Sequence, residues 1–304
     1  MMNEIISRLI DKVQQHAYLG KSVEFYPGYS VFTASTTNCP VTVLYQPMLC
    51  LVLQGSKEVI VGEHQFQYKP GDYFINSVEL PIATRIIESD ANHPYMSISI
   101  QLDPDKLAQI MTETVISHRK VMNDECFLLS RADENLLEPL SRMLDLFKSE
   151  QDVAFLAPMV DREILYRLLK GEQSSVLRQI SGNDFRVNKV REVINWVKDN
   201  FSKAISIQDL IEQAGMSQAS LHRHFRTATG MTPLQYQKTL RLQEARKLLL
   251  EGKEVSETAY DVGYESPSQF SREYARMYGR SPSQDAKRLN DLGASIQDIS
   301  NAPW

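Results

Sequence analysis

Two histidines and two arginines lie close together in the segment LHRHFR, at residues 221–226. Side chains of these types could bind a metal, form a catalytic pair or hold a polyanion. On a β-strand His222 and His224 would share one face and could chelate together, whereas on an α-helix they point about 200° apart. The chemistry of this segment therefore depends on the element that contains it.

The flanking sequence predicts a helix, a tight turn at Gly215 and a second helix over residues 217–229. Leu221 and Phe225 lie four residues apart, so both face the core of such a helix. A separate face is small at its start and cationic further along, and it consists of Ala219, His222, Arg223 and Arg226. A second helix of this kind can enter the major groove of DNA, and the two histidines do not share a metal on it.

The same pattern recurs 49 residues further along the chain. The positions Ser217, Leu221, Arg223, Phe225, Gly230 and Pro233 recur as Ser266, Phe270, Arg272, Tyr274, Gly279 and Pro282. Between the copies we expect one helix from Pro233 to Glu251, roughly 28 Å long at 1.5 Å per residue. Such a helix can hold two reading helices near one DNA turn apart, about 34 Å. Two copies are too few for a solenoid and suit a bipartite binder.

The first half of the chain has a different pattern. Residues 22–101 alternate between apolar and polar residues and are interrupted by turn signals, which predicts a sandwich or small barrel of short strands. Helical spacing begins at Asp103, and a polar linker is expected at Ser181–Asp184. The sequence thus predicts an α+β chain with two domains, at residues 1–183 and 184–304.

Charge and cysteine content agree with this division. The net charge of the 304 residues is −5, but the part from Asp184 onward has 17 basic against 15 acidic residues, and the rest has 16 against 23. The three cysteines are few, odd in number and not in metal spacing, so we expect a reduced, cytoplasmic compartment. The opening residues read as an amphipathic helix rather than a signal peptide, and no membrane span is expected.

The second half resembles the DNA-binding domain of the AraC/XylS family of bacterial transcription regulators. The matching segments are AGMSQASLHRHFRTATGMTPLQY and AYDVGYESPSQFSREYARMYGRSP. The resemblance implies that bases are read by Ala219, His222 and Arg223, and then by Ser268, Gln269 and Arg272. Neighbouring candidates for DNA contact are Ser217, Gln218, Arg226, Pro267 and Arg276. The family has an aromatic and then a basic residue after the final Ser-Pro, where this chain has Asp285 and Ala286; this departure predicts a loosely held last helix.

The first half resembles a sensor domain of the same family. The matching segments are QPMLCLVLQGSKEVIVG, YKPGDYFINSVELP and AFLAPMVDREILYRLL. The resemblance implies a cupin-like small barrel with helices behind it, which binds a small-molecule effector. Candidate effector residues are Cys39 and Cys50, as electrophile or redox sensors, although Cys50 can equally be a small buried hydrophobic residue. Arg85 either meets an anionic effector inside the barrel or faces solvent.

Together these features predict a sequence-specific transcription regulator that is not an enzyme and has no cofactor. The expected partners are double-stranded promoter DNA, an unknown effector and RNA polymerase, with nucleoid association when bound. The resemblance implies an activator, although the residues do not decide between activation and repression. The apolar helical segments LLEPLSRMLDLF and ILYRLL predict a homodimer.

Two other classes compete with this interpretation. A metal-dependent cupin enzyme needs three or four ligands that converge on one ion, whereas His64 and His93 lie beside turns. A ligand-independent DNA-binding protein would leave the β-rich first half without a role. Binding of a small molecule by that half would separate the last class from a ligand-responsive regulator.

Overall fold

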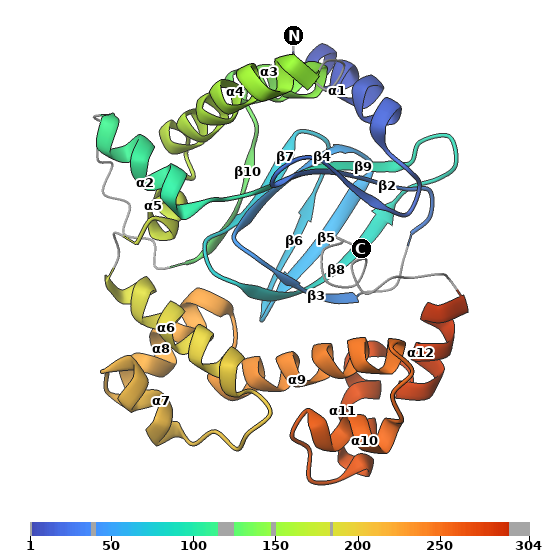
Figure 1. Cartoon of the computed structure of the whole chain (residues 1–304), viewed down its shortest axis with the longest axis vertical. Helices are drawn as coiled ribbons and strands as arrows, with labels where there is room; N and C mark the ends of the chain where they lie inside the picture. Colours follow the sequence, from blue (N-terminus) through green and yellow to red (C-terminus); the bar gives the residue numbers. More distant parts are fainter. Residues whose placement is uncertain (1, 38–40, 115–124, 147–149, 183–184, 292–304) are drawn as a thin grey trace.

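The computed structural model describes residues 2–37, 41–114, 125–146, 150–182 and 185–291. Strands dominate the first half and helices form the second, as Figure 1 shows. The predicted opening helix is α1 (Met2–His16), and it buries Ile5, Ile6, Leu9 and Val13. Within the described residues no helix is both long and apolar enough to cross a membrane. The α+β class is confirmed.

The strands form two antiparallel sheets. The six-stranded sheet has the order β1-β2-β9-β4-β7-β10, with β1 (Ser22–Tyr26), β2 (Tyr29–Ala34), β9 (Tyr95–Gln101), β4 (Met48–Gln54), β7 (Asp72–Asn76) and β10 (Phe127–Arg131). The four-stranded sheet has the order β3-β8-β5-β6, with β3 (Val41–Tyr45), β8 (Leu80–Glu88), β5 (Ser56–Val61) and β6 (His64–Tyr68). The two sheets do not close into one barrel, because β1 and β10 end one sheet while β3 and β6 end the other. Strand β10 was not expected from the sequence.

Large side chains fill the space between the sheets. On β5, Lys57 and Val59 face inward, whereas Glu58 on the other face pairs with Arg85. The same interior contains aromatic rings from both sheets, among them Phe74 and Tyr95. Period-two alternation of side chains along each strand therefore places a polar group at the centre of an aromatic core.

Helices of the first half cover the outer face of the six-stranded sheet (Figure 1). They are α1, α2 (Pro104–Glu113), α3 (Glu134–Asp145), α4 (Glu150–Lys170) and α5 (Ser174–Ile180). The segments that predicted a homodimer belong to α3 and α4. Their apolar side chains, including Leu137, Leu140, Ile164 and Leu168, are buried in this chain's own core.

The described residues of the second half form helices joined by turns, and these helices lie below the four-stranded sheet in the view of Figure 1. Its helices are α6 (Phe185–Asn200), α7 (Ile207–Ala214), α8 (Gln218–Thr229), α9 (Pro233–Leu250), α10 (Val255–Asp261), α11 (Pro267–Tyr278) and α12 (Pro282–Asp291). Of the expected linker, residues 183 and 184 lie outside the described residues. A single apolar cluster continues from the interior of the sheets into α6, α7, α8 and the start of α9. The first half and the first part of the second half therefore share one apolar cluster.

Candidate DNA-binding surface

The first helix-turn-helix unit consists of α7 and α8. Ser206 begins α7 with a reciprocal capping box with Asp209, and Gly215 ends it in the left-handed region at φ 61°. Ser217 caps the start of α8 by accepting a hydrogen bond from the Ser220 amide. Gly215 allows the sharp turn because it has no Cβ, so α8 can leave α7 at a steep angle.

The second unit repeats the first at the predicted spacing. Helices α8 and α11 are each 12 residues long, and α11 begins 49 residues after α8. Ser266 caps α11 as Ser217 caps α8, and Gly279 ends α11 at φ 73° as Gly230 ends α8 at φ 70°. The internal repeat is therefore confirmed down to its caps.

Most predicted DNA-binding side chains lie on exposed faces of these helices. On α8 and its cap the exposed residues are Ser217, Gln218, Ala219, Arg223 and Arg226, with His222 partly buried. On α11 they are Ser268, Gln269, Arg272 and Arg276, with Pro267 partly buried. Beneath each face an apolar pair is buried, Leu221 and Phe225 in one helix and Phe270 and Tyr274 in the other. The same periodicity that builds the core thus presents the polar face to solvent.

Contacts of these polar groups are few and weak, with one exception. Arg272 Nε donates to the Ser268 carbonyl at 3.4 Å, and Gln269 Nε2 donates to Glu273 Oε1 at 3.4 Å. Arg226 instead forms an ion pair of 2.5 Å with Glu63, in the turn between β5 and β6. The exposed polar face of α8 therefore touches the first half of the chain, a contact that sequence reasoning did not predict.

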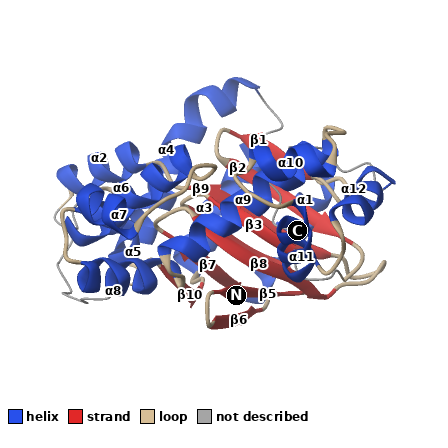
Figure 2. Cartoon of the chain, turned by 90° about the horizontal axis from the view of Figure 1, so that it is seen from below, coloured by secondary structure: helices blue, strands red, loops and turns tan. Residues whose placement is uncertain are grey.

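Helix α9 spaces the two units. It has 18 residues and hence a length of about 27 Å. In both views α8 and α11 lie toward opposite ends of α9 (Figures 1 and 2). This length is of the same order as one turn of DNA, about 34 Å.

The last helix is held tightly, contrary to the expectation from Asp285. The carboxylate of Asp285 is 1% exposed and accepts from Arg246 Nε at 2.8 Å and from the Tyr274 hydroxyl at 2.9 Å. The guanidinium of Arg246 also lies 4.4 Å from the centroid of the Tyr278 ring. This buried ion pair, with the Tyr274 hydroxyl, joins α9, α11 and α12, so Asp285 anchors the last helix.

Cys50 and Arg85, the two predicted effector residues that the structure describes, do not share a site. Cys39 lies outside the described residues. Cys50 is fully buried between the sheets, as the interpretation of a small core residue expects. Arg85 is partly exposed and pairs with Glu58 at 2.6 Å on the outer face of the four-stranded sheet. Of the two alternatives for Arg85, the structure places it away from the interior.

A polar cluster between the sheets was missed by sequence reasoning. Lys57 is 0% exposed and donates to the Tyr45 hydroxyl at 2.9 Å. Burial lowers the pKa of Lys57 to about 8, and the nearby Cys50 opposes this shift. Among the described residues, the hydroxyls of Tyr68 and Tyr95 have no hydrogen-bond partner. The alternation of β5 was the available signal, because it places Lys57 on the same face as Val59.

The described residues contain no candidate metal site. Across the described ranges, no three histidine, cysteine, aspartate or glutamate side chains lie close enough to hold an ion. His64 packs against the Phe127 ring, with centroids 5.5 Å apart. His93 lies in an exposed turn, 3.7 Å from Asp90.

The fold and this surface define a class of protein, a β-rich domain joined to a helical domain with two helix-turn-helix units. Residues 26–176 match the model of the AraC-type transcriptional regulator N-terminus, and residues 210–288 match a helix-turn-helix domain. The chain belongs to the AraC family of transcription regulators.

Relatives and solved structures agree with this family. The chain is 29% identical over 155 residues to the HTH-type transcriptional activators RhaS of Salmonella agona and of Escherichia fergusonii. The match covers 50% of this chain and 55% of the relative, so the chain spans about half the length of the curated relatives it matches. ToxT from Vibrio cholerae shares the fold at 12% identity with a TM-score of 0.54, over 87% of this chain and 99% of that chain. An equally similar structure is ToxT bound to an unsaturated fatty acid, matched over 85% of this chain and 94% of that one.

Proposed function

We propose that this chain regulates transcription by binding promoter DNA through α8 and α11 and that a small molecule controls this binding. The observation that supports it most is the pair of exposed polar faces, repeated at an offset of 49 residues and spaced by α9. We place the division of labour at residues 1–183 for sensing and 184–304 for DNA binding.

The roles of individual residues follow from their positions on these faces. Arg223 and Arg272 are equivalent, exposed and near the middle of each second helix, where guanidinium groups can contact guanine edges. Arg226 and Arg276 lie further along and suit phosphate contacts. Ser217 is occupied as a helix cap, so we assign it a structural role before any DNA contact.

The test is selection of DNA fragments by the full chain, followed by Arg223→Ala and Arg272→Ala. Each substitution should relax the base preference of one half-site at about 1–3 kcal/mol, with half-sites one helical turn apart. Arg226→Ala is the matched control, because loss of a phosphate contact should weaken all sequences alike and flatten the salt dependence. Equal weakening on every sequence by Arg223→Ala would assign that arginine to phosphate instead.

Response to an effector requires contacts that link the halves. Arg191 on α6 donates to the Gln179 carbonyl at 2.7 Å, which ties α5 to α6. Glu79, which precedes β8, forms an ion pair with Lys198 of α6, and its carbonyl accepts from the Tyr236 hydroxyl of α9 at 3.1 Å. A ligand that favours one arrangement of these contacts would shift DNA affinity by roughly 5- to 150-fold, and DNA would shift ligand affinity equally.

Further parts of the proposal rest on family membership and surface character. We infer activation rather than repression from the RhaS activators, RNA polymerase as a partner, a cytoplasmic location with nucleoid association, and a non-enzymatic role. Self-association would use the exposed apolar side chains of α4, Phe155, Leu156 and Met159, since the apolar residues first considered are buried. Sedimentation of wild type and Phe155→Ser at micromolar concentration tests this; a monomeric wild type contradicts it.

A further inference from the structure

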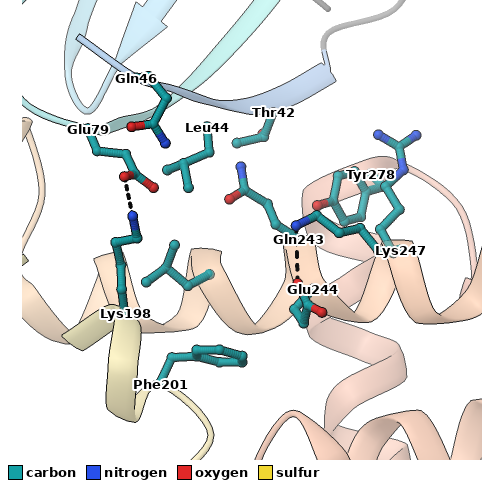
Figure 3. Close-up of a pocket in the computed structure, with 12 residues that line it drawn as sticks. Thr42, Leu44, Gln46, Glu79, Lys198, Phe201, Gln243, Glu244, Lys247 and Tyr278 are labelled. Carbon is teal, nitrogen blue, oxygen red and sulfur yellow. Dashed lines mark hydrogen bonds and ion pairs between the residues drawn. The ribbon is translucent and has the colours of Figure 1, made fainter. Parts of the chain in front are cut away.

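A cavity of about 330 Å³ lies between the two halves of the chain. Its sensor wall is formed by β3 and its neighbours, with Thr42, Leu44 and Gln46, and its floor is formed by α9 (Figure 3). Phe201 and Leu240 add apolar surface. The volume falls at the lower end of the range of small-molecule sites, roughly 300–1,000 Å³.

Polar atoms in this cavity lack partners. The amide of Gln243 reaches from α9 toward Thr42 and Leu44 (Figure 3), and both its nitrogen and its oxygen are buried without a hydrogen-bond partner among the described residues. The Tyr278 hydroxyl and Glu79 Oε1 are also buried without a hydrogen-bond partner among the described residues. Leaving such groups buried and unpaired is unfavourable, and a bound compound with matching donors and acceptors would satisfy them.

The charges around the cavity are already neutralised. Lys198 pairs with Glu79, Lys247 lies 3.2 Å from Glu244, and Arg246 pairs with Asp285. A carboxylate or phosphate would bring its charge near the free oxygen of Glu79 without an unpaired cation to receive it. The open groups instead offer an N–H donor and a carbonyl acceptor at Gln243, a hydroxyl at Tyr278 and an acceptor at Glu79.

From these observations we propose that the cavity binds a small uncharged compound with hydroxyl or carboxamide groups beside an apolar face. Because the walls come from β3, α6, α9 and the end of α11, the bound compound contacts both the sensor and the DNA-binding half. That it acts as the effector rests on the proposed function, whereas its binding does not.

The test uses the full chain and two matched pairs of probes, nicotinamide with nicotinate and sorbitol with gluconate. Saturation-transfer NMR and thermal melting measure binding. We expect at least one uncharged probe to bind saturably and its charged partner to bind at least tenfold more weakly.

Two variants locate the binding. Gln243→Leu should weaken binding of the probe at least tenfold, because it removes the amide that would pair with the probe. The chain should stay folded, because the substitution removes only buried polar atoms that have no partner. Gln208→Leu makes the same change on α7, where the Gln208 amide donates to Glu212 at 3.0 Å, and should leave binding unchanged. Leu44→Phe, which fills the cavity from the sensor side, should weaken binding like Gln243→Leu.

Absence of binding by all four probes would overturn the proposal, as would equal or tighter binding of the charged probes or unaltered binding by Gln243→Leu. Retardation of promoter DNA by the same preparations is measured separately. A chain that binds a probe but no DNA contradicts the proposed function alone, and one that binds DNA but no probe contradicts the cavity alone.

Discussion

The two helix-turn-helix units have the same local structure but different surroundings. The first shares its apolar core with the sensor half, and its helix α8 touches the sensor turn at Gly62 and Glu63. The second has a separate cluster formed by α9, α10 and α11, held by the buried pair of Arg246 and Asp285. The position of the first unit therefore depends on its contacts with the first half of the chain, whereas the second depends chiefly on its own contacts.

The largest expected effect concerns the second unit. Asp285→Ala should destabilise the chain by about 3–5 kcal/mol, since it leaves the buried Arg246 without its partner. Asp261→Ala is the control, because Asp261 pairs with Lys253 at the surface and should contribute less than about 1 kcal/mol. Urea unfolding measures the free energy of unfolding of both variants. Equal losses in the two would show that the buried ion pair does not anchor the second unit.

The equivalent glycines Gly230 and Gly279 compare the two surroundings directly. A Cβ at Gly230 would lie 2.8 Å from the Val61 carbonyl oxygen, whereas at Gly279 nothing lies within 4 Å. Alanine at either position strains the left-handed backbone by about 1–2 kcal/mol. Gly230→Ala should lose about 1–3 kcal/mol more, because the sensor backbone must move. Equal losses in thermal or urea unfolding would show that the first unit is not pressed against the sensor.

The pH dependence of stability tests the shared core. The pKa of Lys57 is lowered to about 8 in the folded chain by burial, and an unfolded lysine has a pKa of about 10.4. Between these values the unfolded chain binds more protons, so stability rises with pH, by roughly 1.5 kcal/mol from pH 8 to 9.5. The slope should vanish in Lys57→Met. When the pH is raised from 8 to 9.5, the hydrogen-exchange protection factors of amides in α7 and α8 should increase, because these helices share the apolar cluster between the sheets. Those in α10 and α11, which belong to a separate cluster, should not change.

The smallest effect concerns the ion pair of Glu63 and Arg226. Both side chains are largely exposed, 80% and 57%, so the pair contributes little to stability. Glu63→Gln frees Arg226 for phosphate and should raise DNA affinity of the full chain by less than about fivefold. The gain should shrink in an Arg226→Ala background, as a double-mutant cycle measured by DNA titration would show. If Glu63→Gln raised DNA affinity just as much in the Arg226→Ala background, the effect would not come from the ion pair of Glu63 and Arg226.

Local signals made much of the fold predictable. Ser217, Gly230 and Pro233 mark helix starts and ends through contacts within a few residues, and their recurrence 49 positions later identified the second unit. Strand alternation likewise predicted short strands over residues 22–101, where β1 to β9 lie. Strand β10 was missed because it is short and is defined by pairing with β7, far away in the sequence.

The sequence by itself determined the order of the elements, the two equivalent reading helices and the exposed faces that carry Arg223 and Arg272. Tertiary structure alone decided which polar groups found partners. Asp285 meets Arg246 across 39 residues, and Glu63 meets Arg226 across 163. The Gln243 amide on α9 is buried only because folding brings the first half of the chain over this helix. The physical reason is range, because caps and periodicity act within one or two turns, whereas burial and charge pairing depend on segments that only folding brings together.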